Sequence, residues 1–160
     1  MKRLLTGTAF LFALGAAVCV PAFAASAPAP GSELRARIVT LLGDYGRKDA
    51  DGIVAMLDPA EAVVMGTAST EVATTPAAIR ALLESDFRGW DRSRFGDLRN
   101  YSVRASGDIA TAFFDVPWTA TAGSGDRSYV LRVASTWHWD GASWRLAQWT
   151  NAVVTVPAQR

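Results

Sequence analysis

Residues 129–154 read YVLRVASTWHWDGASWRLAQWTNAVV, two runs typical of β-strands that are joined at Asp140-Gly141. An Asp-Gly pair between alternating apolar runs predicts a β-hairpin, because glycine readily adopts the positive φ of a tight turn. Residues opposite each other in a hairpin share a face of the sheet. One predicted face holds Leu131, Val133, Ser135, Trp137 and Trp139 with Trp144, Leu146, Gln148 and Thr150. This face is the more apolar of the two, so we expect it to cover the core.

The N-terminus is typical of a secretory signal peptide. Lys2 and Arg3 precede an apolar run over 4–20, and Ala22-Phe23-Ala24 supplies a small-x-small cleavage site. We expect residues 1–24 to be removed and the protein to be exported to the periplasm or secreted. The alternative is a membrane anchor, although a run of about 17 apolar residues is near the lower limit for a spanning helix.

The remaining chain is expected to hold one domain. Residues 25–32 (ASAPAPGS) have the composition of a flexible tether, and residues 33–156 are long enough for a single packed core. The full chain has sixteen basic and fifteen acidic residues, and the loss of Lys2 and Arg3 leaves fourteen basic ones. Without a basic cluster, this composition does not predict a nucleic-acid partner or binding to a membrane surface after cleavage. One histidine, and one cysteine that lies in the signal peptide, are too few for a zinc site. No metal and no other cofactor is predicted.

Helices are expected before the sheet. Apolar residues recur at three- and four-residue spacing over 33–46, which predicts an amphipathic helix. A shorter helix is expected over 49–56 and a third over 76–90, with a brief strand at 62–65 between them. From residue 98 onward the pattern is that of strands. Three helices followed mainly by strands indicate an α+β fold in which helices cover one face of the sheet.

Four segments in this order resemble a known family: YGRKDADGIVAML, VVMGTASTE, TTPAAIRALL and HWDGASWRLAQW. Over about 33–154 the chain is similar to a SnoaL-like domain of the nuclear-transport-factor-2-like (NTF2-like, cystatin-like) superfamily. The resemblance implies a cone, with three N-terminal helices packed on a curved, mostly antiparallel sheet. It also implies an apolar pocket at the open end and, commonly, a dimer packed through the sheets. The superfamily contains isomerases, cyclases, dehydratases and binding domains, so the fold does not decide the function.

The closing strand departs from the pattern of many SnoaL-like domains, which carry histidines there. Gln148 and Thr150 stand where those imidazoles would lie. This removes the obvious general base. The candidate catalytic residues are therefore Tyr45, as a hydrogen-bond donor, and Asp86, the carboxylate on the inner side of the third helix. The alternative roles are core packing for Tyr45 and an ordinary solvated or arginine-paired carboxylate for Asp86.

The many tryptophans of the second half predict the wall of a pocket for a small, flat, apolar molecule. The predicted pocket residues are Tyr45, Trp90, Trp118, Ser135, Trp137, Gln148 and Thr150. The alternative is that the tryptophans only fill the core. On the other face of the hairpin, Ala134, Ala147 and Trp149 form an apolar patch beside His138, which predicts a homodimer interface.

Two functions stay open at this point. The first is a domain that binds a small hydrophobic molecule or serves as a dimeric assembly module, without catalysis. The second is an enzyme of the ketosteroid-isomerase or polyketide-cyclase type, which acts by proton transfer on a small hydrophobic substrate. The two differ in whether a carboxylate and a hydroxyl group converge inside the cone.

Overall fold

The computed structural model describes residues 27, 29–123 and 125–154. The predicted signal peptide and residues 25, 26 and 28 of the predicted tether lie outside the described residues. The first helix, α1 (Gly31–Gly46), begins within the last two residues assigned to that tether. Two further helices follow, α2 (Ala50–Ala55) and α3 (Pro76–Arg88). Within the described ranges, no helix is both long and apolar enough to cross a membrane.

Side chains cap the second and third helices where the sequence predicts their starts. The Asp49 carboxylate accepts a hydrogen bond from the backbone N–H of Gly52 at 2.8 Å. The Thr75 hydroxyl accepts one from the backbone N–H of Ala78 at 3.2 Å, and proline occupies the first turn of α3. Each cap satisfies a backbone N–H that the helix leaves free, and such a cap stabilises the helix by about 1 kcal/mol.

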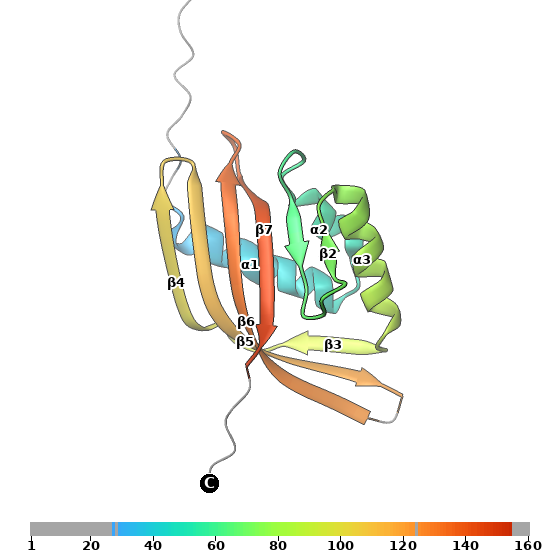
Figure 1. Cartoon of the computed structure of the whole chain (residues 1–160). Helices are drawn as coiled ribbons and strands as arrows, with labels where there is room; N and C mark the ends of the chain where they lie inside the picture. The colour runs from blue at the N-terminus through green and yellow to red at the C-terminus, as the bar shows by residue number, and fades with distance from the viewer. Residues whose placement is uncertain (1–26, 28, 124, 155–160) are drawn as a thin grey trace, which may run out of the picture.

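The described strands form one curved sheet (Figure 1). They are β1 (Val63–Met65), β2 (Val72–Ala73), β3 (Arg92–Phe95), β4 (Arg99–Ser106), β5 (Ile109–Ala122), β6 (Gly125–Trp139) and β7 (Trp144–Val153). The order is β2-β1-β7-β6-β5-β3, with β4 also paired to β5. The β1–β7 pair is parallel and the other strand pairs named here are antiparallel. The α+β fold with helices before the main strands is therefore confirmed.

The curvature of β5 and β6 turns the sheet into a cone. Their upper halves pair with β4 and β7, while their far ends bend away under the helices, where β5 pairs with β3 (Figure 1). The three helices lie over the concave face (Figure 1). The core between the two layers contains Leu34 and Ile38 of α1 and Ile79 of α3, each no more than 1% exposed.

A β-bulge in β7 reverses which side chains face the core. Thr136 pairs with Gln148, but the next residue, Trp137, pairs with Leu146, so Ala147 is an extra residue in β7. Side chains alternate between the two faces of a strand, and one extra residue moves every later side chain to the opposite face. The predicted face therefore holds for Trp144 and Leu146, and it is wrong for Gln148 and Thr150.

Candidate functional site

The concave face of the sheet and the helices enclose a cavity of about 470 Å³. This volume lies within the range of small-molecule sites, roughly 300–1,000 Å³. Its aliphatic wall comes from all three helices and the sheet, and its aromatic side chains are Tyr45, Trp90, Phe95, Trp118, Tyr129 and Trp149. The cavity is thus mostly apolar, and its few polar groups are the candidates for orienting a ligand.

A tyrosine and a carboxylate meet at the wall of this cavity. The Tyr45 hydroxyl of α1 donates a hydrogen bond to Asp86 Oδ2 of α3 at 2.8 Å, and both side chains are half-buried. The Tyr45 ring packs edge-on against Phe87 and Phe95 and is stacked on Trp90. The packing holds the ring while the hydroxyl reaches the carboxylate. Both catalytic candidates therefore lie at one place in the cavity.

Lys48 fixes the end of the helix that carries Asp86. Its ammonium group donates hydrogen bonds to the carbonyl oxygens of Phe87 at 2.8 Å and Trp90 at 2.5 Å. It also lies 4.6 Å from the centroid of the Trp90 ring. A cation at the C-terminal end of a helix satisfies free carbonyl groups and complements the helix dipole. The positions of Asp86 and Trp90 relative to α1 thus depend on Lys48. Lys48 itself lies two residues after the end of α1 and has a positive φ of 61°.

The surroundings change the proton affinity of both groups. Burial, followed by the nearby negative charge of Asp86, raises the pKa of Tyr45 far above its ordinary value. Burial also raises the pKa of Asp86, and the charge of Glu71 adds to this rise, while the hydrogen bond from Tyr45 opposes it. A carboxyl group with a raised pKa in a cavity is a common feature of functional sites, because it can exchange a proton nearer to neutral pH.

Glu71 is a second carboxylate of the cavity, and the sequence interpretation did not single it out. It precedes β2, and its Oε2 accepts a hydrogen bond from the backbone N–H of Ala68 at 3.0 Å. The side chain folds against Gly66, where a Cβ atom would lie 2.1 Å from Glu71 Oε2. Residue 66 therefore has to be glycine for the carboxylate to take this position.

Among the predicted pocket residues, the structure separates two groups. Trp90 and Trp118 line the cavity together with Tyr45. Trp137 does not line it, since it is fully buried in the core and donates its indole N–H to Ser135 Oγ at 3.0 Å. Ser135 is thereby satisfied as an acceptor from a neighbour on its own strand. Both of these residues face inward as predicted, but neither reaches the cavity.

Gln148 and Thr150 lie on the outer face of the sheet, as the bulge at Ala147 requires. Gln148 is exposed, and its amide nitrogen lies 3.4 Å from the Thr150 hydroxyl. In their place Trp149 and Asn151 face the cavity. Trp149 packs edge-on against Phe114, with ring centroids 5.9 Å apart. The outer patch predicted for a homodimer therefore lacks Trp149.

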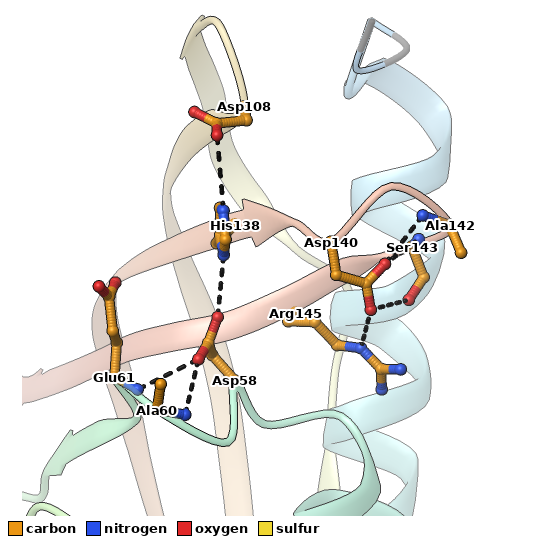
Figure 2. A network of polar contacts seen from close by, with 9 residues as sticks. All are labelled: Asp58, Ala60, Glu61, Asp108, His138, Asp140, Ala142, Ser143 and Arg145. Atoms are coloured by element: carbon orange, nitrogen blue, oxygen red, sulfur yellow. Dashed lines mark hydrogen bonds and ion pairs between the residues drawn. The ribbon is translucent and has the colours of Figure 1, made fainter. Parts of the chain in front are cut away.

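His138 lies outside the cavity, between two carboxylates (Figure 2). Its Nδ1 is 2.9 Å from Asp58 Oδ2, and its Nε2 is 3.5 Å from Asp108 Oδ2. Asp58 also accepts backbone N–H groups from Ala60 and Glu61. The hydrogen bond with Asp58 raises the pKa of His138 and lowers the pKa of Asp58. This network ties the loop after α2 to β6, a structural role.

No group of three or more metal-ligating side chains occurs in the part of the chain that the structure describes. The cavity itself offers two carboxylates, Asp86 and Glu71, as anionic groups. Its chemistry is therefore that of an apolar chamber with a hydrogen-bonded Tyr–Asp pair and a second acid.

The sequence of this chain matches a known domain family. The profile of the SnoaL-like domain matches residues 34–155. An NTF2-like protein with a cystatin-like fold from Novosphingobium aromaticivorans is similar in structure, with a TM-score of 0.67, 22% sequence identity, and coverage of 79% of this chain and 83% of that chain. No curated protein matches the sequence significantly.

Two further solved structures share the fold. An NTF2-like protein of unknown function from Pseudomonas putida has a TM-score of 0.67 and 19% identity, covering 79% of this chain and 88% of that chain. A ketosteroid isomerase-like protein from Erwinia carotovora has a TM-score of 0.67 and 17% identity, covering 79% and 98% respectively. At these identities the likeness is one of fold.

Proposed function

The chain belongs to the SnoaL-like domain family, and we propose that its cone binds a small, largely apolar molecule whose polar end contacts the Tyr45–Asp86 pair. The observation that carries this proposal is the cavity of about 470 Å³, apolar over most of its wall and polar at that pair. Asp86 accepts one hydrogen bond, from Tyr45, and its carboxylate keeps further acceptor sites, so a ligand with a hydrogen-bond donor can bind there.

Filling the cavity should abolish binding. Leu82 of α3 lines the cavity and is half-buried, so Leu82→Trp places a large side chain in the ligand space. Val39 of α1 is 49% exposed and does not line the cavity, which makes Val39→Trp the matched control. Isothermal titration calorimetry with 1-naphthylmethanol, a neutral bicyclic alcohol, should show binding to the wild type and the control. Equal affinity of the Leu82→Trp protein for the alcohol would locate binding elsewhere and refute the proposal.

Proton transfer is the second candidate function, and the Tyr45–Asp86 hydrogen bond of 2.8 Å supports it. A carboxylate and a hydroxyl group converge in the cavity, and the raised pKa of Asp86 suits a group that takes up and returns a proton. In this reading Asp86 removes a proton from the carbon next to a ketone, and Tyr45 orients the carboxylate.

Hydrogen exchange into a neutral ketone tests this second candidate without knowledge of the natural substrate. In D₂O, the protein should accelerate deuterium incorporation at C1 of 2-tetralone, followed by proton NMR, and Asp86→Asn should remove the acceleration. Glu84 lies on the same helix but is exposed, so Glu84→Gln serves as the control. An Asp86→Asn protein as fast as the wild type would rule out the carboxylate as the base.

Export and self-association remain proposals. The outer face of the sheet carries Phe113, which is 48% exposed, beside Ala134 and Thr150. Phe113 takes the place that the prediction gave to Trp149. We therefore retain a homodimer packed through this face, with Phe113 as its central apolar side chain.

A further inference from the structure

The charged side chains of the cavity are all acidic. Asp86 and Glu71 line it, and no Arg, Lys or His occurs among the described residues that do so. Neither carboxylate forms an ion pair with a described basic residue. Other acids of the chain do form such pairs, for example Asp115 with Arg132 and Asp140 with Arg145. The two carboxylates line the same cavity, where the charge of Glu71 acts on Asp86, and no described cation that lines the cavity balances them.

The basic side chains that follow Tyr45 in sequence, Arg47 and Lys48, are both already engaged. Arg47 forms an ion pair with Asp44, and Lys48 bonds to the end of α3. Its ammonium group is bound by the carbonyl oxygens of Phe87 and Trp90, and the residue does not line the cavity. Lys48 therefore does not neutralise Asp86, whose side-chain hydrogen bond is with the Tyr45 hydroxyl.

Aromatic rings surround the same space. Trp118 and Tyr129, on neighbouring strands, are stacked with their centroids 6.0 Å apart, and both line the cavity. Trp90 and Trp149 add two further indole rings. The face of an aromatic ring carries negative potential and attracts cations, most strongly for tryptophan. The carboxylates and the indole faces therefore both favour a ligand with a positive charge.

We propose that the ligand of this cavity is an organic cation with an apolar body, such as a protonated amine, whose ammonium group contacts Asp86 and Glu71. The inference rests on the proposed binding function and adds the charge class of the ligand. An ammonium group donates hydrogen bonds to the carboxylates and adds the Coulomb attraction of a full positive charge, which a neutral alcohol lacks. A carboxylate ligand of the same shape meets two like charges in a poorly solvated space.

Three bicyclic probes that differ only in their polar group test the charge class at neutral pH. They are 1-naphthylmethylamine, which is protonated, 1-naphthylmethanol, which is neutral, and 1-naphthoate, which is anionic. Calorimetry on the full wild-type protein should rank the amine first, about tenfold tighter than the alcohol. The naphthoate should bind at least about tenfold more weakly than the alcohol.

Variants locate the source of the preference. Glu71→Gln should weaken binding of the amine several-fold and should weaken binding of the alcohol by less. Gly66→Ala should act in the same direction, because its Cβ displaces the Glu71 carboxylate. Glu84→Gln removes an exposed acid on the outer side of α3 and should change neither affinity.

Each result of these titrations supports or refutes the proposal that the ligand is a cation. An alcohol that binds as tightly as the amine overturns the cation proposal and leaves the binding function intact. A naphthoate that binds as tightly as the amine also overturns it. If none of the three probes binds, the proposed function fails together with the charge class. An amine preference that survives Glu71→Gln and Asp86→Asn unchanged places the cation elsewhere and refutes the proposal.

Discussion

Replacing Tyr45 with phenylalanine isolates the hydrogen bond on which the candidate site depends. The ring packs against Phe87, Trp90 and Phe95, and phenylalanine keeps that packing, so the change removes only the hydroxyl group. A hydrogen bond to a charged group contributes about 1.5–3 kcal/mol when it is buried. Because Asp86 is only half-buried, water replaces part of the lost bond. We expect the free energy of unfolding to fall by about 1–2 kcal/mol at neutral pH.

A double-mutant cycle separates this bond from other effects of the substitutions. Tyr45→Phe, Asp86→Ala and the double variant are unfolded in urea and followed by tryptophan fluorescence. The predicted coupling energy is about 1–2 kcal/mol, above the error of about 0.3–0.5 kcal/mol within which independent sites add. Coupling within that error would show that the hydroxyl and the carboxylate do not interact in solution, and the account of the site would be refuted.

The coupling should also depend on pH in one direction. The hydrogen bond from Tyr45 lowers the pKa of Asp86 relative to the same carboxyl group without it. This part of the stability is therefore present when the carboxylate is charged and is lost as the pH falls through the folded-state pKa of Asp86. The cost of Tyr45→Phe should be smaller at about pH 4 than at about pH 7. A cost that grows as the pH falls would contradict this assignment.

Other substitutions test the fold and its surface. Trp144→Ala removes a fully buried side chain and should lower the free energy of unfolding by about 3–5 kcal/mol in urea melts. The free energy of unfolding of Gln148→Leu should stay within about 0.5 kcal/mol of the wild-type value because Gln148 is exposed. A loss as large as that of Trp144→Ala would contradict the outward position that the bulge gives Gln148. The pair that His138 forms with Asp58 should stabilise the fold most between about pH 4 and 6.5, and this stability should be lost as the pH rises through the raised pKa of His138. His138→Asn should therefore lower the free energy of unfolding by less at about pH 9 than at about pH 5.5. An equal loss at both pH values would argue against the pair. Phe113→Arg should shift a dimer toward monomer in sedimentation; a wild-type monomer at micromolar concentration would end the dimer proposal.

The predictable parts of the fold carry strong local signals. Asp140-Gly141 marks the hairpin of β6 and β7, and Thr75-Pro76 marks the start of α3. The inward side of α3 follows from its periodicity, which is why Asp86 could be placed toward the cavity. Its contact with Tyr45, 41 residues earlier, depends on how α1 packs against α3, and no local pattern contains that information.

The predicted inner face of β7 is wrong after residue 147 because a β-bulge leaves little trace in the sequence. Ala147 is an ordinary strand residue, and strict alternation through it places Gln148 and Thr150 inside. In the structure, two segments pair with β7 in parallel. Leu57 pairs with Leu146, before the extra residue, and Val63 pairs with Gln148, after it. Glu71 was missed for a related reason, since its place in the cavity depends on the fold of the β1–β2 connection against Gly66.

Intermolecular nuclear Overhauser effects between 1-naphthylmethanol and the methyl groups of the protein test the central claim most directly. Ile79, Val116 and Val133 line the cavity and are at most 1% exposed, so a ligand reaches their methyl groups only from inside the cone. The account predicts contacts from the naphthyl protons to these three residues and none to Thr150 or Ala134 on the outer face of the sheet. Contacts confined to Thr150 and Ala134 would show that the molecule binds the outer face and that the cavity is not the binding site.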